Sequence, residues 1–192
     1  MTPGTIDSVI RDALAALKAG GVILYPTDTV WGLGCDATNE AAVARVFGIK
    51  RRSEAKSLVL LASDLDMVAM HVRQIPSIAI DLVEVNDAPM TIIYPGAQYL
   101  APNVVAEDGS VGIRIPQNDF CVQLVKRLRK PLVSTSANIS GEPAPAGFDG
   151  ISPEIVAAAD YVVPAWVDRD STGRASQIIK LGLRGEVEII RA

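Results

Sequence analysis

Residues 6–25, IDSVIRDALAALKAGGVILY, contain the two patterns that decide the fold class of this chain. Apolar residues recur with helical spacing over residues 6–17, which predicts an amphipathic helix that Thr5 caps and Gly20-Gly21 ends. Residues 22–25 follow as a short, wholly apolar strand, the kind that is buried on both faces. The chain therefore opens with a helix and then a buried strand.

The same alternation continues along the chain. Further helices are predicted from Asn39 to about Gly48, after a capping box at Ser63 and Asp66, and at 77–85 and 153–159. Another helix holds residues 120–128, and either Asn118 or Asp119 caps it. Strands are predicted at 58–61, 91–94, 111–116, 131–134 and 161–163, and the tail reads as a hairpin of two strands, 176–181 and 186–191. This pattern predicts an α/β protein with a twisted, mixed, open sheet and helices on its faces, in a single domain over residues 1–192. Residues 140–153, rich in glycine and proline, are expected to form a long functional loop.

Composition narrows the function classes. The 192 residues are 49% hydrophobic and 21% charged, which excludes a disordered chain. A net charge of −4 argues against binding of nucleic acid by bulk charge. Two cysteines are too few for a disulfide framework or a structural zinc site, and the single histidine, His71, is expected to be a packing residue. We expect no metal site made by the protein, and chemistry that depends on positioning and charge.

The cellular location can be predicted from the cysteines and the N-terminus. Two cysteines without a disulfide framework fit a reducing compartment. The chain shows no signal peptide and no apolar run of the roughly 20 residues that cross a bilayer. A cytoplasmic protein with no membrane association is the expectation.

Three segments and two isolated arginines could carry chemistry. Residues 25–34, YPTDTVWGLG, place two threonines and an aspartate after a buried strand, where a simple turn and a ligand site are equally good interpretations. Residues 50–56, KRRSEAK, are either a solvated basic loop or a clamp for polyphosphate. Residues 134–141, STSANISG, deliver hydroxyl groups at the end of a strand and favour an anion site. Arg114 and Arg191 each lie in an apolar strand and must either pair with an acid or reach a cleft.

Together these segments resemble the YrdC-like family, the bacterial threonylcarbamoyl-AMP synthases, over essentially the whole chain. The matching motifs are residues 26–33, Lys50 with Arg52, residues 112–116, residues 134–141, and Ser176 followed by a terminal strand that ends in Arg191. The resemblance implies a concave, positively charged cleft. It also implies an enzyme that condenses L-threonine, bicarbonate and ATP, with Mg²⁺, into threonylcarbamoyl-adenylate and pyrophosphate. A separate complex would then transfer the threonylcarbamoyl group to tRNA.

The resemblance also implies roles for individual residues. The set that marks the cleft and its catalysis would be Lys50, Arg52, Ser136 and Asn138. ATP would contact Lys50, Arg52, Lys56, Ser110, Ser136 and Arg191, and threonine would contact Thr29, Arg114, Ser134 and Ser176. The chain departs from the family pattern in five places: Trp31 replaces a tyrosine, Ser53 a proline, Gln177 a threonine and Ala144 a serine, and the pair Lys56-Ser57 replaces a pair that ends in proline.

Two alternatives remain at this stage. One is a paralogue of the same fold that binds tRNA or double-stranded RNA without catalysis, on a basic surface extended by Lys126, Arg127, Arg129 and Lys130. The other is a carbamoyl-adenylate enzyme that acts on carbamoyl phosphate, which ranks last because the chain is short.

Overall fold

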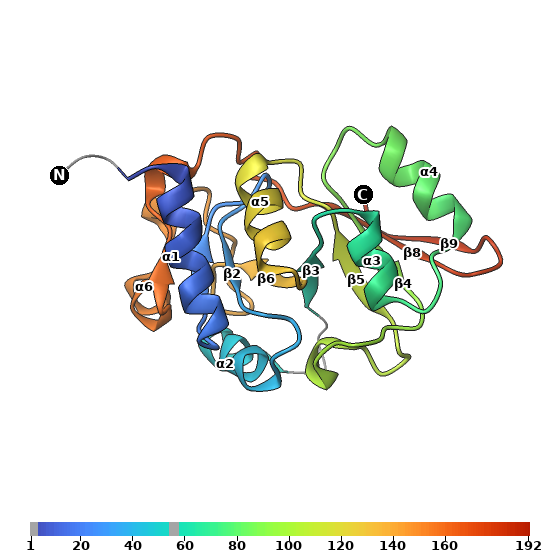
Figure 1. Cartoon of the computed structure of the whole chain (residues 1–192), viewed down its shortest axis with the longest axis horizontal. Coiled ribbons are helices and arrows are strands. Elements are labelled where there is room, and N and C mark those ends of the chain that lie inside the picture. Colours follow the sequence, from blue (N-terminus) through green and yellow to red (C-terminus); the bar gives the residue numbers. More distant parts are fainter. Residues whose placement is uncertain (1–3, 54–57) are drawn as a thin grey trace.

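The computed structural model describes residues 4–53 and 58–192, and it contains one mixed sheet with helices packed against it (Figure 1). The helices are α1 (Ile6–Lys18), α2 (Glu40–Lys50), α3 (Leu65–His71), α4 (Ser77–Val85), α5 (Asp119–Leu128) and α6 (Pro153–Ala158). Short 3₁₀ turns cover Pro102–Val104, Phe148–Gly150 and Ala165–Val167. The strands are β1 (Ile23–Tyr25), β2 (Gly32–Gly34), β3 (Val59–Leu61), β4 (Met90–Tyr94), β5 (Val111–Arg114), β6 (Leu132–Ser136), β7 (Tyr161–Val162), β8 (Gln177–Leu181) and β9 (Val187–Arg191).

The helix starts follow local side-chain chemistry. Thr5, Asn39 and Asn118 each accept a hydrogen bond from a backbone N–H in the first turn of α1, α2 and α5. The first two caps were predicted, and of the two candidates for α5, Asn118 and Asp119, the structure selects Asn118. The predicted cap at Ser63 is wrong, because Asp64 caps α3 by accepting from the N–H of Met67 at 2.8 Å.

Over the residues that the structure describes, the sheet has nine strands in the order β7-β1-β2-β6-β3-β5-β4-β8-β9. The pairs β1–β7, β3–β5 and β4–β8 are parallel and the remaining pairs are antiparallel, so the expected mixed sheet is confirmed. The predicted closing hairpin is β8 and β9. The sequence prediction missed β2, stopped β6 two residues early and extended β5 two residues too far.

Close packing around the strand β2 requires a glycine at position 34. A Cβ on Gly34 would lie 2.4 Å from the carbonyl oxygen of Val133 and 2.7 Å from the ring of Tyr25. The ring of Tyr25 therefore fills the space beside Gly34, and only glycine fits there.

The two faces of the sheet differ in character. Leu60 lies opposite Ile113 and Val133, and all three are buried, so this face is covered. Its neighbour Val59 points to the other face and lies opposite Ser134 and Gly112. The second face therefore carries hydroxyl groups and a glycine at the centre of the sheet.

The helices α1 and α5 pack side by side across one face of the sheet (Figure 1). Among the described residues, no helix is long and apolar enough to span a membrane.

Candidate functional site

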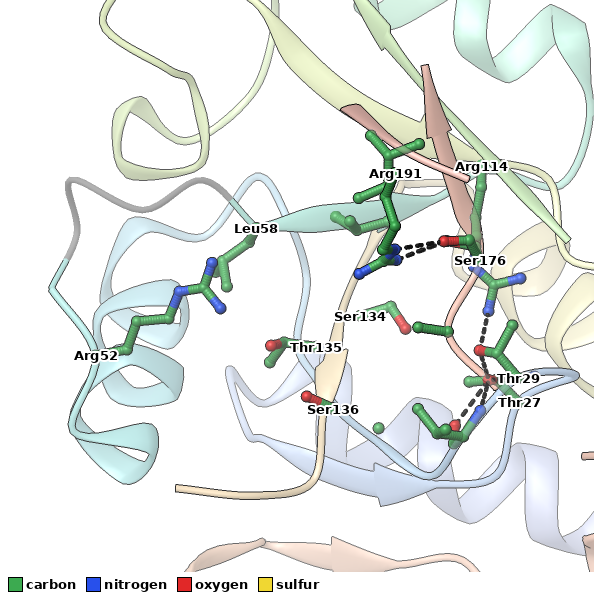
Figure 2. A pocket seen from close by; sticks show the side chains of 15 residues that line it. Thr27, Thr29, Arg52, Leu58, Arg114, Ser134, Thr135, Ser136, Ser176 and Arg191 are labelled. Atoms are coloured by element: carbon green, nitrogen blue, oxygen red, sulfur yellow. Dashed lines mark hydrogen bonds between the residues drawn. The ribbon is translucent and has the colours of Figure 1, made fainter. Parts of the chain in front are cut away.

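A cavity of about 230 Å³ lies over the centre of the sheet, and we call it the main cavity. Its lining comes from the β1–β2 loop (residues 26–31), the end of α2, and strands β3, β5, β6, β8 and β9 (Figure 2). The lining residues are Thr27, Thr29, Val30, Gly32, Arg52, Leu58, Val59, Arg114, Ser134, Thr135, Ser136, Ala175, Ser176, Ile178 and Arg191. Segments far apart in sequence therefore meet at one hollow.

Arg114 is held from the β1–β2 loop. Its Nη1 donates to Oδ1 of Asp28 at 2.7 Å, and its Nη2 donates to the hydroxyl of Thr29 at 3.1 Å. The side chains of Arg114 and Asp28 are only 4% and 7% exposed, so this is a buried ion pair. The second carboxylate oxygen of Asp28 accepts from the N–H of Gln117 at 2.9 Å. The sequence allowed Arg114 either to pair with an acid or to reach a cleft, and in the structure it does both.

The β1–β2 loop is both a turn and part of the cavity wall. The hydroxyl of Thr27 lies 2.8 Å from that of Thr29 and accepts from the N–H of Thr29 at 3.0 Å. These bonds fix the loop conformation and direct two hydroxyl groups at the cavity.

Strand β6 contributes three consecutive residues, Ser134, Thr135 and Ser136, to the lining of the main cavity, and each carries a hydroxyl group. Arg52 lies on one side of this strand, while Arg114 and Thr29 lie on the other (Figure 2). Burial lowers the pKa of Arg52, but arginine stays charged at neutral pH. The hydroxyl row thus runs between two guanidinium groups.

Lys50 is placed behind this row and does not line the main cavity. It is 1% exposed, and its ammonium donates to the carbonyl oxygens of Ser136 at 2.5 Å and Asn138 at 2.7 Å. The side-chain oxygen of Asn138 accepts from Lys50 at 3.4 Å. The structure therefore brings Lys50, Ser136 and Asn138 together as one hydrogen-bonded group that supports the end of β6. Burial, followed by the charge of Arg52, lowers the pKa of Lys50 to about 8.

Arg191 and Ser176 approach the main cavity from the closing hairpin. Nε and Nη2 of Arg191 donate to the carbonyl oxygen of Ser176 at 2.8 and 2.5 Å. The hydroxyl of Ser176 lies 2.8 Å from that of Thr91. These bonds hold the guanidinium of Arg191 at the cavity wall (Figure 2).

Ser110 lies in a second cavity of about 120 Å³, which shares Leu58, Val59 and Ile178 with the main cavity. Its hydroxyl donates to Asp108 at 2.6 Å. Ser110 is thus next to the main cavity rather than in it. Lys56 lies outside the described residues, so its predicted contact with ATP stays a prediction.

Three polar residues at the site belong to the predicted segments 25–34 and 134–141, but no individual role was predicted for them: Asp28, Thr27 and Thr135. Asp28 and Thr27 were visible as polar residues within a segment of apolar character. Their partners, however, lie on β5 and within the loop itself, so a linear pattern could not find them.

The described lining of the main cavity contains three arginines and no acidic residue, and Asp28, which pairs with Arg114, is not part of that lining. Guanidinium and hydroxyl groups bind phosphate and carboxylate oxygens. The arrangement suits an elongated ligand with more than one anionic group. Within residues 4–53 and 58–192, no three His, Cys, Asp or Glu side chains are grouped so as to hold a metal ion.

Comparison with known proteins agrees with this geometry. The family model Sua5/YciO/YrdC, described as "Telomere recombination", matches residues 15–192. The threonylcarbamoyl-AMP synthase of Stenotrophomonas maltophilia is 36% identical over 162 residues, which cover 83% of this chain and 85% of that protein.

Two solved structures of P. abyssi Sua5 share the fold. The H234A/Y235A variant superposes with a TM-score of 0.86 at 25% identity, over 95% of this chain and 55% of that one. The complex with L-threonine gives a TM-score of 0.82 at 25% identity, over 90% of this chain and 50% of that one. This chain thus spans about half the length of the P. abyssi protein.

Proposed function

Because the chain belongs to the Sua5/YciO/YrdC family, we propose that it is a threonylcarbamoyl-AMP synthase. The enzyme condenses L-threonine, bicarbonate and ATP into threonylcarbamoyl-adenylate and releases pyrophosphate. The adenylate then supplies the threonylcarbamoyl group for tRNA modification by a separate complex, in the cytoplasm. The observation that carries this proposal is the meeting of Arg52, Arg114 and Arg191 with a row of hydroxyl groups in one cavity.

The reaction joins two anionic reactants. The amino group of threonine attacks the carbon of bicarbonate, and loss of water gives a carbamate. An oxygen of this carbamate then attacks the α-phosphorus of ATP. The bond to pyrophosphate breaks, and the two electrons of that bond leave with it. Fixed positive groups lower the repulsion between carbamate and triphosphate, and they stabilise the charge that grows on pyrophosphate. No imidazole base is needed for these steps.

Threonine is assigned to the side of the cavity formed by Thr29, Arg114, Ser134 and Ser176. Arg114 binds the carboxylate with the N–H groups that Asp28 and Thr29 leave available. Because Asp28 neutralises part of its charge, Arg114 acts more through directed hydrogen bonds than through net charge.

ATP is assigned to the side formed by Arg52, Ser136 and Arg191, and the adjoining second cavity brings Ser110 within the same region. Lys50 and Asn138 fix the carbonyl groups at the end of β6 and so hold Ser136 in place. A direct contact between Lys50 and the phosphates requires Lys50 to exchange one of its carbonyl acceptors for a phosphate oxygen. The cleft is positively charged under this assignment.

Mg²⁺ is proposed to enter with ATP as part of the substrate. The described residues offer no cluster of acidic ligands for a resident ion. Mg²⁺ is commonly bound through substrate phosphates and water, so the triphosphate itself supplies its ligands.

The proposal is tested by incubating the protein with Mg²⁺, ATP, bicarbonate and L-threonine and detecting threonylcarbamoyl-adenylate by mass spectrometry. A product peak that disappears when threonine is omitted is expected. Arg52→Ala should reduce pyrophosphate release by about 100-fold or more, because a fixed charge at the phosphates is lost. Lys50→Ala should have a similar effect, because it removes the ammonium group that holds the end of β6, and with it Ser136, in place.

Arg51→Ala is the matched control. Arg51 is the neighbouring residue, and its guanidinium points to Glu154 at the surface, 2.7 Å away. This variant should retain the activity of the wild type. Near-normal turnover in Arg52→Ala, with circular dichroism showing an intact fold, contradicts the assignment of Arg52 to the phosphates.

The RNA-binding alternative has a separate test. Two of the four basic residues that were expected to extend an RNA surface are ion-paired, Arg127 with Asp7 and Lys130 with Asp36, both at 2.6 Å. Titration with tRNA over a salt series separates the two functions. Tight binding that falls steeply with salt, from protein that makes no adenylate, favours the binding module.

A further inference from the structure

A long connection joins the two ends of the sheet, and its position depends on the β1–β2 loop. Residues 163–176, which we call the crossover, run from β7 at one edge of the sheet to β8, next to the opposite edge. The crossover ends at Ala175 and Ser176, which line the main cavity. The placement of these two residues therefore depends on what holds the crossover in position.

Three hydrogen bonds join the crossover to the β1–β2 loop. The N–H of Gly173 donates to the carbonyl oxygen of Thr29 at 2.8 Å, and the N–H of Thr172 donates to that of Asp28 at 3.1 Å. The hydroxyl of Ser171 also donates to the carbonyl oxygen of Thr29, at 2.8 Å. The backbone of Thr29 thus receives two bonds from the crossover while its side chain contacts Arg114.

Trp31 provides a fourth attachment, and it is the one made by two side chains. Its indole N–H donates to Oδ2 of Asp168 at 2.6 Å, and the indole is 1% exposed. The ring of Trp31 also lies 5.0 Å from that of Phe148, between centroids, so it contacts the long loop as well. A hydrogen bond between a buried N–H and a carboxylate is among the stronger side-chain attachments in proteins.

We propose that Trp31 and Asp168 are positioning residues that fix the crossover against the β1–β2 loop and so set the relative position of Thr29 and Ser176. The pair touches no substrate. It acts through the four attachments, which make the β1–β2 loop and the start of β8 one rigid wall of the main cavity. The kinetic part of this inference rests on the proposed function, because it takes Thr29 and Ser176 as contacts of threonine.

The kinetic test compares Asp168→Ala, Asp168→Asn and Trp31→Phe. Loss of the indole–carboxylate bond should raise KM for L-threonine about tenfold, while kcat and KM for ATP stay within about twofold. Asp168→Asn keeps an oxygen that accepts from the indole, and it should restore KM to within about threefold of the wild type. A merely structural role would change all three parameters together and would give no such restoration.

Two variants serve as matched controls. Trp166→Phe changes a tryptophan of the same crossover that is 40% exposed, and Asp7→Ala removes an acid whose ion pair with Arg127 lies at the surface. Both should keep the threonine KM of the wild type. Trp166→Phe also leaves Trp31 as the single tryptophan, so its fluorescence reports on the pair directly.

A second measurement does not depend on catalysis. Amide hydrogen exchange at Thr172 and Gly173 should speed up in Asp168→Ala and Trp31→Phe, and it should return toward the wild-type rate in Asp168→Asn. Unchanged exchange overturns the proposal, and so does an equal fall of kcat and kcat/KM for both substrates. A wild type that makes no adenylate refutes the proposed function, while the exchange data still decide the positioning role.

Discussion

The β1–β2 segment and the β8–β9 hairpin both place polar side chains at the main cavity, yet they do so in opposite surroundings. β1 is completely buried between β7 and β2, whereas β9 is an edge strand in which Ile189 is 72% exposed. The first supplies Thr27 and Thr29, and the second supplies Ser176 and Arg191. An apolar strand sequence thus does not by itself fix burial. The position of a strand in the sheet decides how far it is buried.

The difference has an energetic consequence. In the β1–β2 segment, polar groups such as Asp28 are buried and depend on particular partners, so removal of one partner leaves another group unsatisfied. Along β9, whose residues are all exposed, water can replace a lost partner. Substitutions in the two regions should therefore differ in effect, from the largest at Asp28 to the smallest at Ile189.

Removal of Asp28 is expected to have the largest effect. Asp28→Ala leaves the guanidinium of Arg114 buried without its carboxylate, which should lower the free energy of unfolding by about 3–5 kcal/mol. Urea unfolding measures this change. Lys180→Ala breaks the exposed pair between β8 and Asp108 and should cost less than about 1 kcal/mol. Equal losses in the two variants would contradict the contrast.

Gly34→Ala is expected to have the next largest effect. The added methyl group meets the carbonyl of Val133 and the ring of Tyr25, and overpacking of this kind costs about 1–3 kcal/mol. Gly48→Ala is the matched control, since Gly48 lies in α2 with no atom within 4 Å of the added Cβ. This control should be neutral or more stable by up to about 1 kcal/mol. Thermal unfolding of the two variants gives the comparison.

The buried lysine predicts a pH dependence. A lowered pKa of about 8 means that Lys50 is charged below pH 8 and neutral above it. If the charged form is needed, kcat/KM for ATP should fall about tenfold per pH unit above pH 8, because this parameter reports the free enzyme. Lys50→Arg should move this decline to much higher pH, because arginine keeps its charge.

The control for this profile is Lys180→Ala, since the pKa of Lys180 is raised by its bond to Asp108. This variant should leave the decline near pH 8 unchanged. A decline that persists in Lys50→Arg would assign the titration to another group.

Ile189→Thr on β9 is expected to have the smallest effect. The side chain is largely exposed and threonine suits a strand, so stability should change by less than about 0.5 kcal/mol. Urea unfolding checks this value. A loss above 1.5 kcal/mol would mean that β9 is covered in solution.

Much of the fold could be predicted from sequence because it is locally encoded. The caps at Thr5, Asn39 and Asn118 act within one turn of their helices, and the apolar runs of β1, β3 and β4 are visible as short windows. The error at Ser63 was also local, since serine and aspartate are adjacent caps of similar strength and geometry chose Asp64. The strand β2 was missed because its glycines have low strand propensity, and only the packing of Val133 and Tyr25 around Gly34 explains the second of them.

The candidate site was predicted as a set of residues but not as an arrangement. The sequence placed Arg52, Arg114, Ser134, Ser136, Ser176 and Arg191 in candidate motifs, and the structure brings all six to one cavity. It could not separate Lys50 and Asn138, which support the end of β6, from Arg52, which lines the cavity. That distinction depends on the direction of each side chain after the strands have paired.

By itself the sequence determined most of the helix starts, the apolar strands, the mixed α/β class and the residue types of the site, because each depends on neighbours along the chain. Only the tertiary structure decided the strand order, the burial of Asp28 with Arg114, and the attachment of the crossover to Trp31 and Thr29. These contacts join residues that are 86 and 137 positions apart in sequence. Their energies come from burial and geometry that exist only once the sheet has formed.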